Sequence, residues 1–322
     1  MNSAIEDLKS IPAYIKPLKE KKIHAGGNSS VYEWENEDGS YIVKKFSGAN
    51  SNIAERFERE ESSLILLEQN GIENVPRLLY SDFDSRIIIT NKLPGNKPVK
   101  LTLDIFMQYY KISKLLQKKC ISIPSKLIVK NASDSLLEPM RLVTKIKKEF
   151  DAVKMLIDCE SNTSNDFYLE ATNIINQKEK SLQITKKMRP VLDRHKIFSF
   201  SDLGPRNMLL DNTKVYFLDF EHAGWDDPIK GIIDLLICPT NEITAEDSKK
   251  IVQFVINNNQ ENGFAENFLS WLPILSIKWI IIYIKYNLKL HKKTSIKLKE
   301  VQSIYLKGRH TRKQIENVIK NN

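Results

Sequence analysis

Two short apolar segments of the sequence each end in side chains that suit phosphate chemistry. The segment FSFSDLGPRNMLL, residues 198–210, contains Asp202 and, five positions later, Asn207, and the segment FLDFEHAGWDDP contains Asp219. Transfer of a phosphoryl group requires a carboxylate that accepts the proton of the attacking hydroxyl and hard oxygen ligands for Mg²⁺. Asp202 suits the first role, and Asn207 and Asp219 suit the second. Asp and Asn are also common at the ends of loops. For these three residues taken alone, a purely structural role in two ordinary turns is therefore as well supported as a role in phosphoryl transfer.

The chain between these residues predicts a β-hairpin. The apolar runs MLL and VYFLDF flank the polar sequence DNTK, so we expect the turn at Asp211–Asn212. Such a hairpin returns Asp219 to the side of Asn207, although the two residues are twelve positions apart in the chain. The two residues would then share one site.

Three features nearer the N-terminus match the same chemistry. The sequence GGNSSVY, residues 26–32, lies between two predicted strands, where glycines let backbone N–H groups approach a phosphate, although such a sequence is more often only a tight hairpin. In the strand YIVKKF side chains alternate, so one of Lys44 and Lys45 faces the cleft. A buried lysine needs a carboxylate partner, which Glu60 or Glu61 could supply. Taken singly, the two lysines could equally be surface residues of a strand, and the glutamates could be solvated residues of a helix.

The remaining pattern predicts an α+β fold of two unequal lobes. Alternating apolar residues and turn signals predict antiparallel strands at 21–25, 29–35, 40–46, 76–83 and 86–93, with one helix over 52–71. After LPGNKP, residues 93–98, the pattern becomes helical over 101–119, 135–156, 165–187 and from 229 onward. We therefore expect a small nucleotide-binding lobe at 1–93, a short hinge, and a large α-rich lobe at 94–322.

Composition places the chain among globular proteins. Its 322 residues are 41% hydrophobic and 28% charged, and its three cysteines, Cys120, Cys159 and Cys238, form no CxxC pair. Unpaired thiols and the absence of a signal-peptide pattern predict a cytoplasmic protein. The most apolar stretch, residues 268–286, is interrupted by Pro273 and Lys278, so we expect a buried helix and no transmembrane segment.

Most of the net charge of +9 lies in one segment. Residues 289–322 carry ten Lys and Arg against two Glu. The interpretation favoured for this segment is a solvated helix face, and a surface that binds an anionic partner is the alternative. No nucleic-acid partner is expected, because basic and aromatic residues do not alternate along the segment. If this segment is separate from the catalytic body, trimming the chain from Gly308 should leave turnover intact.

Taken in order, these motifs resemble the aminoglycoside phosphotransferase and choline kinase family, whose fold is similar to that of protein kinases. The family pattern is His-x-Asp-x-x-x-x-Asn, a hairpin, then Ile or Leu, Asp, Phe or Trp, and Glu or Gly; FSDLGPRN and LDFE correspond to it here. GWDDP followed by DLL resembles the family's Gly-Asp-Pro…Asp-Leu-Ala segment. LPGNKP lies where the family has its hinge. The resemblance extends from about residue 23 to 287, and its catalytic half is the more specific.

The resemblance implies a role for each matching residue. It makes Asp202 the catalytic base, Asn207 and Asp219 ligands of Mg²⁺, Lys44 the phosphate-binding lysine and Glu60 its partner. It also implies a nucleotide loop of Gly26, Gly27, Asn28 and Ser29, a hinge that contacts adenine through the backbone at Lys92 and Leu93, and a structural carboxylate at Asp234. Phe200 departs from the pattern, because the family usually has histidine there.

The function implied is transfer of the γ-phosphoryl group of ATP, with Mg²⁺, to a hydroxyl of a small molecule such as a sugar, an amino alcohol or an aminoglycoside-like compound. Glu221, Trp225, Asp226 and Asp227 lie near the metal segment and could contact the acceptor. A protein kinase is less well supported because no Ala-Pro-Glu segment and no long activation loop follow Asp219. Phe200 motivates a second hypothesis, a pseudokinase that binds nucleotide without catalysis. The basic segment motivates a third hypothesis, a scaffold that binds anionic partners.

Overall fold

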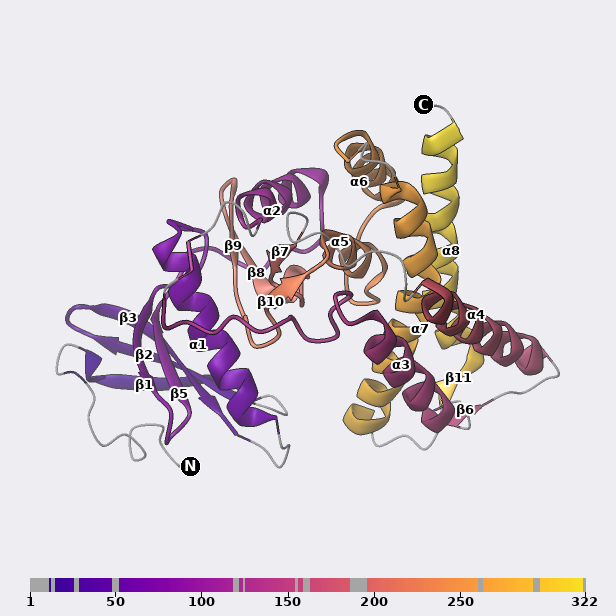
Figure 1. The fold of residues 1–322 in the computed structure, drawn as a ribbon. Coiled ribbons are helices and arrows are strands. Elements are labelled where there is room, and N and C mark those ends of the chain that lie inside the picture. Colours follow the sequence, from indigo (N-terminus) through magenta and orange to yellow (C-terminus); the bar gives the residue numbers. More distant parts are fainter. Residues whose placement is uncertain are drawn as a thin grey trace.

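The computed structural model describes residues 12, 15–25, 29–47, 52–117, 122–123, 125–153, 156–158, 163–185, 196–259, 263–291 and 296–320. Within these residues, a small β-rich lobe and a larger helical lobe lie side by side (Figure 1). The predicted two-lobed α+β architecture is therefore confirmed. The proposed boundary between residues 93 and 94 stays a prediction.

A five-stranded antiparallel sheet, ordered β1-β2-β3-β5-β4, forms the small lobe. Its strands are β1 (Lys19–Ala25), β2 (Ser29–Asn36), β3 (Gly39–Phe46), β4 (Leu78–Asp82) and β5 (Ile87–Asn91). Helix α1 (Ile53–Gln69) lies against this sheet (Figure 1). These bounds agree with the predicted strands and helix to within a few residues.

Strand β3 shows why the sheet directs one lysine inward. Tyr41 and Val43 pack in a small apolar cluster on one face of the sheet. Phe46 packs edge-to-face on Phe57 of α1, with ring centroids 5.9 Å apart, on the other face. Because side chains alternate along a strand, Lys44 shares the face of Phe46, and its ammonium lies 4.7 Å from the centre of that ring.

The segment between the lobes is held against the large lobe. Asn96 and Leu210 exchange backbone hydrogen bonds of 3.1 and 2.8 Å. Gly95 has φ +98°, and a Cβ atom there would lie 2.6 Å from the Leu210 carbonyl oxygen. Glycine is thus required at this position both by the backbone conformation and by the close approach.

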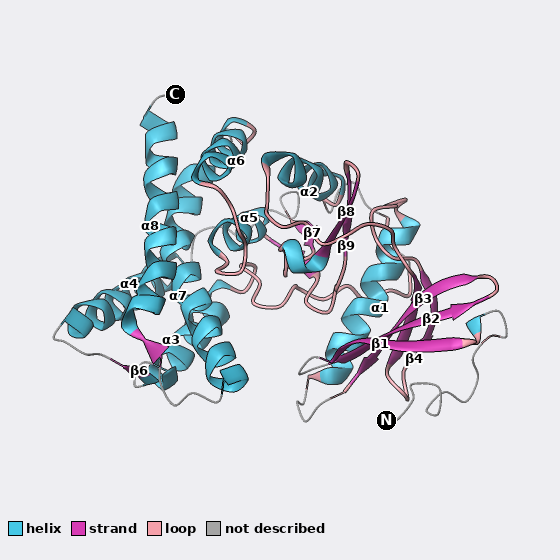
Figure 2. Ribbon diagram, turned by 180° about the vertical axis from the view of Figure 1, so that it is seen from behind, coloured by secondary structure: helices cyan, strands magenta, loops and turns pink. Residues whose placement is uncertain are grey.

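The large lobe is mainly helical (Figure 2). Its helices are α2 (Leu103–Leu115), α3 (Pro139–Val153), α4 (Thr163–Thr185), α5 (Pro228–Ile237), α6 (Ala245–Asn257), α7 (Phe264–His291) and α8 (Leu298–Lys320). Short strands make three two-stranded pairs: β7 (Ile197–Ser199) with β10 (Gly224–Asp226), β8 (Met208–Asp211) with β9 (Lys214–Phe217), and β6 (Ile157–Asp158) with β11 (Ile296–Lys297). The β6–β11 pair was not foreseen from the sequence.

Helix α7 accounts for the most apolar stretch of the sequence. Among the described residues, Phe264–Lys289 is the one helical segment that is long and apolar enough to cross a membrane, with a mean hydropathy of 1.5. The structure buries 67% of that apolar window within the lobe. Packing in the lobe therefore explains its composition, as the sequence predicted for a core helix.

Helix α8 contains much of the basic segment and is part of the core. Val301, Ile304 and Ile315 are at most 3% exposed. The Lys307 ammonium donates hydrogen bonds of 2.9 Å to the carbonyl oxygens of Cys238 and Asn241. This packing argues against a basic segment that is separate from the catalytic body. The effect of trimming from Gly308 on turnover stays a prediction. The described basic side chains of α8 nevertheless include the exposed Arg309, Arg312 and Lys313, as a solvated helix face requires.

Candidate active site

The β8–β9 hairpin brings the two chemical segments together. Met208 pairs with Phe217 in the antiparallel register, and the Leu218 amide donates a 2.9 Å hydrogen bond to the Asn207 carbonyl oxygen. Asp219 therefore follows directly after a residue bonded to Asn207. The predicted hairpin is confirmed, with its turn at Asn212–Thr213, one residue later than expected.

Both segments contain a residue in the left-handed backbone region. Ser201, directly before Asp202, has φ 66°, and Asp219 itself has φ 65°. Such conformations in residues other than glycine cost on the order of 1–3 kcal/mol and concentrate at functional sites. Here they occur at, or next to, the two carboxylates that the sequence singled out.

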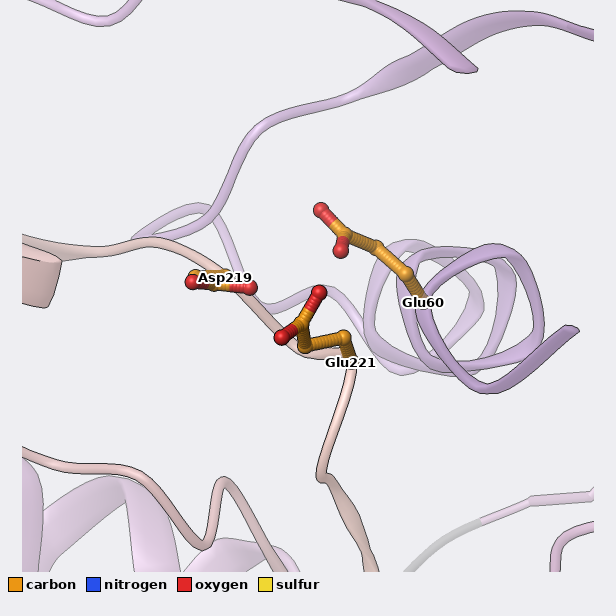
Figure 3. Close-up of side chains that lie close together, drawn as sticks. All are labelled: Glu60, Asp219 and Glu221. Carbon is orange, nitrogen blue, oxygen red and sulfur yellow. The ribbon is translucent and has the colours of Figure 1, made fainter. Parts of the chain in front are cut away.

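The Lys44 ammonium is surrounded by three carboxylates, one from α1 and two from the segment that follows β9. It lies 2.5 Å from Glu60 Oε2 of α1, 2.7 Å from Asp219 Oδ1 and 3.4 Å from Glu221 Oε2. Figure 3 shows the three carboxylates pointing toward one another. Of the two glutamates considered as partners of the lysine, Glu60 is thus the one in contact, whereas Glu61 accepts a hydrogen bond from the Ser81 hydroxyl.

The cluster has more negative than positive groups. Arg56, one turn before Glu60 on α1, pairs with Glu221 and is the second cation beside the three carboxylates. Burial alone would lower the pKa of Lys44, but Glu60, Asp219 and Glu221 together raise it well above its ordinary value. Burial raises the pKa of Glu60 to about 7, a rise that Lys44 only partly offsets. The ammonium thus stays charged in a site that has one carboxylate in excess.

The carboxylates of this cluster are of the type that binds divalent cations, and in this structure the Lys44 ammonium lies among them. One oxygen each of Glu60, Asp219 and Glu221 lie within 4.8 Å of one another. Carboxylate oxygens are the hard ligands that Mg²⁺ prefers. Burial would raise the pKa of Asp219, but Lys44 holds it below its ordinary value, so this carboxylate is ionised and able to serve as a ligand.

Asp202 is oriented by groups from its own loop. Arg206 donates from one guanidinium nitrogen to both carboxylate oxygens of Asp202, at 2.7 and 2.9 Å. The Asn207 side-chain amide donates to the Asp202 backbone carbonyl at 2.9 Å and to Oδ2 at 3.3 Å. The side chain of Asp202 is 25% exposed, so it remains reachable from the adjoining cavity.

A buried lysine anchors the residue before Asp202. Lys230 on α5 is 2% exposed and donates a 3.0 Å hydrogen bond to the Ser201 hydroxyl. Its ammonium also lies 3.2 Å from Asp234 and 3.6 Å from Asp226. Through Lys230, the position of the Asp202 loop depends on α5.

The nucleotide-loop and hinge assignments stay predictions. Gly26, Gly27 and Asn28 lie outside the described residues, while Ser29 begins β2 opposite Phe46. The Lys92 amide donates a 3.1 Å hydrogen bond to the Ser40 carbonyl, and its side chain pairs with Glu33. Leu93 follows in the connecting segment and is half-buried.

Three of the four residues suggested for acceptor contacts are buried away from the cavity beside Asp202. Trp225 packs edge-to-face on Phe198, with centroids 6.2 Å apart. Asp226 is fully buried and accepts hydrogen bonds from the Ser135 hydroxyl and the Leu136 amide. Asp227 caps α5 by accepting from the Ile229 amide. These contacts stabilise the lobe, so the structure does not bring the three residues to the cavity.

The remaining predicted residues have clear positions. Glu221, the fourth, lines the cavity and joins the Lys44 cluster. Asp234 is buried and accepts from the Lys278 ammonium at 2.6 and 2.8 Å and from the Trp279 indole at 2.8 Å. It therefore links α5 to α7, in keeping with the structural role expected for it.

Two arginines at the site were missed from the sequence. Arg206 lies within the motif itself, four residues after Asp202, and Arg56 lies four residues before Glu60 on one helix. Residues four apart on a helix share a face. The spacing of Arg56 from Glu60 could therefore have indicated that both reach the same cluster.

Structural comparison identifies the fold. No protein-family model matches the sequence, and the comparison with curated proteins returns no match. Spectinomycin phosphotransferase APH(9)-Ia in complex with AMP superposes with a TM-score of 0.59 at 16% identity, over 95% of this chain and 94% of that chain. Its complex with ADP and spectinomycin gives 0.56 at 16% identity, over 95% and 93%.

A second solved structure leads to the same assignment. The ADP-bound aminoglycoside phosphotransferase APH(2'')-Ib gives a TM-score of 0.53 at 17% identity, over 94% of this chain and 95% of that chain. The match covers both lobes in each case. The chain therefore has the two-lobed, protein-kinase-like fold of the aminoglycoside phosphotransferases.

Proposed function

We propose that this chain is a phosphotransferase that moves the γ-phosphoryl group of ATP to a hydroxyl group of a small molecule. The observation that carries the proposal is the position of Lys44, held between Glu60 and Asp219. The hydrogen bond from the Leu218 amide to Asn207 joins the Asp219 segment to the Asp202 loop. Four separate segments contribute to this site. Solved structures of the same fold contain ADP or AMP, which supports a nucleotide as the donor.

The chain's own residues have distinct roles in this proposal. Lys44 binds phosphate oxygens of the nucleotide, and Glu60 keeps the ammonium in place. Asp202 accepts the proton of the acceptor hydroxyl, as a general base does. The two carboxylate oxygens of Asp202 can together accept about four hydrogen bonds. Arg206 uses only part of this capacity, so the acceptor hydroxyl can donate to the same carboxylate beside Arg206. In this proposal residues 26–29 serve as the nucleotide loop and the backbone at Lys92 and Leu93 serves as the adenine contact.

Asn207 and Asp219 would hold Mg²⁺, in agreement with the hard oxygen ligands of this site. When bound, the ion neutralises charge on the phosphates during transfer. The chain in turn orients both ligands, because the Leu218 amide fixes the Asn207 backbone next to Asp219. We propose a cytoplasmic location, in agreement with the sequence.

The test is Mg²⁺-dependent ADP release from ATP, measured over a panel of small hydroxyl compounds. We expect turnover by the wild type and loss of at least about 10²-fold in Asp202→Asn, since general-base catalysis contributes ~10²–10⁴-fold. Asp211→Asn, at the end of β8 in the same hairpin, is the matched control and should retain turnover. Equal activity of the two variants would exclude Asp202 as the base.

A pseudokinase is the second candidate, because Phe200 replaces the family's histidine and Arg206 pairs with Asp202. Calorimetry distinguishes the two functions. A protein that binds ATP with Mg²⁺ but releases no ADP with any compound of the panel would be a pseudokinase. A protein that binds no nucleotide would exclude both functions.

A further inference from the structure

The cavity beside Asp202 is of the right size for a small ring compound. Its volume is about 410 Å³, and typical small-molecule sites measure about 300–1,000 Å³. Helix α1 of the small lobe lines one side. The large lobe lines the rest with α3, α5, α7, the Asp202 loop and the loop segments at 133–134 and 221–222. A compound bound there would reach the candidate base directly.

Every carboxylate that lines this cavity among the described residues has its own cation from the chain. Asp202 pairs with Arg206 and Glu221 with Arg56. The other three pairs are Glu55 with Arg59 at 2.8 Å, Asp134 with Lys145 at 2.6 Å, and Asp234 with Lys278 at 2.6 Å. Lys230 is the one further lysine or arginine in the described lining, and it lies between Asp226 and Asp234. The lining is thus close to electrically neutral.

This one-to-one pairing disfavours a charged acceptor. An acceptor with several ammonium groups would have to separate carboxylates from their arginines and lysines, and an unpaired charge in a partly buried site is costly. An anionic acceptor would have to compete with those carboxylates for the cations. A hydroxyl group both donates and accepts hydrogen bonds, so it can bind between the members of a pair and leave the pair intact.

One wall of the cavity is apolar. Trp279 and Ile282 line it from α7 and, being three residues apart, share one helix face. The Trp279 indole N–H already donates to Asp234, so no free donor remains on this side chain. The side chain of Ile282 is 40% exposed. A ring with a C–H face could pack here while its hydroxyl groups reach the charged pairs opposite.

We propose that the acceptor is an uncharged polyhydroxyl ring compound, of the sugar or cyclitol class, bound between the α7 wall and the charge pairs around Asp202. The proposal rests on the function proposed above and specifies its substrate class. It separates this chain from the solved neighbours whose acceptors are aminoglycosides, such as gentamicin in one complex.

The first experiment compares kcat/KM across acceptor classes. The panel contains neutral sugars and cyclitols, their amino and phosphate derivatives, and gentamicin and spectinomycin as cationic probes. We expect the highest kcat/KM within the neutral class. A cationic or phosphorylated compound as the best acceptor would overturn the substrate class while leaving the phosphotransferase function in place. No ADP release with any class, despite folded protein, would overturn both.

The second experiment changes one charge pair. Lys145→Gln on α3 leaves Asp134 without its cation, so the ratio of kcat/KM for the amino derivative to that for the best neutral acceptor should rise about tenfold, equivalent to about 1.4 kcal/mol. Lys147→Gln is the matched control on the same helix, since Lys147 pairs with Glu179 outside the cavity lining. An unchanged ratio in folded Lys145→Gln, or an equal rise in the control, would contradict the proposal.

Discussion

The ring of Phe200 lies edge-to-face on the ring of Phe220, with centroids 5.1 Å apart and planes at 84°. Phe200 precedes Asp202 by two residues and Phe220 directly follows Asp219, so one apolar contact joins the two loops of the candidate site. Phe217 adds a third ring, 5.3 Å from Phe200. Such aromatic pairs contribute about 0.5–1.5 kcal/mol beyond their buried area. The contact thus fixes one loop relative to the other without a hydrogen bond.

Asp219→Ala should abolish Mg²⁺-dependent turnover, because it removes the charged ligand proposed between the metal ion and the phosphates. The structure adds a second effect, since Lys44 loses one of its carboxylate partners. ADP release at increasing Mg²⁺ concentration measures the change. Asp211→Ala at the end of β8 is the control and should retain Mg²⁺ dependence. Full activity of Asp219→Ala at ordinary Mg²⁺ concentration would exclude this residue as a ligand.

Lys44→Ala should damage catalysis far more than Lys45→Ala. The two side chains point to opposite faces of β3, and Lys44 alone of the two is paired with Glu60 and Asp219. Loss of one preorganised charge at a reacting phosphate is expected to cost about 10²–10³-fold in kcat. Steady-state kinetics with ATP measure the difference. If Lys45→Ala were the damaging change, the assignment of the phosphate lysine would be wrong.

Glu60 should make the stability of the small lobe depend on pH. Its pKa is raised to about 7 by burial, so the folded protein holds a proton that the unfolded chain releases near pH 4.5. The stabilising effect of this protonated group is fully present below pH 4.5 and is lost as pH rises through about 7. In Glu60→Gln this dependence should disappear, so that the variant gains stability relative to wild type between pH 4.5 and 7.

The measurement is the midpoint of urea unfolding at several pH values in this range. Glu61→Gln on the same helix is the matched control, because Glu61 contacts Ser81 instead of Lys44. It should keep the pH dependence of the wild type. A Glu60→Gln curve parallel to the wild type would show that Glu60 keeps an ordinary pKa in the folded protein.

Ile315→Ala in α8 should destabilise the large lobe by about 2–5 kcal/mol, the usual cost of removing a buried isoleucine side chain. Ile315 is 1% exposed, and ending the chain before Gly308 would remove it together with the buried Thr311. The midpoint of thermal unfolding measures the stability of Ile315→Ala and of the chain that ends before Gly308. Lys313→Ala, at an exposed position of the same helix, should have little effect. A truncated chain as stable as the wild type would contradict the assignment of α8 to the core.

Local pattern was enough to predict the elements and part of the site. Strand alternation limited the phosphate lysine to Lys44 or Lys45, and the turn sequence DNTK predicted the hairpin that returns Asp219 to Asn207. The core position of α8 could also have been foreseen. Its buried residues Val301, Ile304, Thr311 and Ile315 recur at helical spacing, but the basic charge of the segment directed attention to its surface.

Contacts between distant segments could not be predicted in the same way. Asp226 looked available for an acceptor because it follows the metal segment, yet Ser135, 91 residues away, buries it. The pairing of Arg56 with Glu221 spans 165 residues. The first pair depends on how segments of the large lobe pack together and the second on how the two lobes pack. Neither periodicity nor turn composition contains that information.

The role of Phe200 is tested by Phe200→His. The wild-type ring is 3% exposed and is surrounded by the rings of Tyr109, Phe217 and Phe220. A histidine there would bury a polar ring, and an unsatisfied buried polar group costs about 1–3 kcal/mol. We therefore expect a less stable enzyme that is no faster. Thermal unfolding and ADP release measure the two effects.

Phe200→Leu is the matched control, because it keeps an apolar side chain at the contact with Phe220. If Phe200 acts only by packing, the leucine variant should retain turnover with a modest loss of stability. The decisive comparison is between ADP release by Phe200→His and ADP release by the wild type, provided that the wild type binds ATP. Should the wild type release no ADP with any acceptor while Phe200→His gains turnover, the absence of histidine is what stops catalysis, and the natural protein is a pseudokinase.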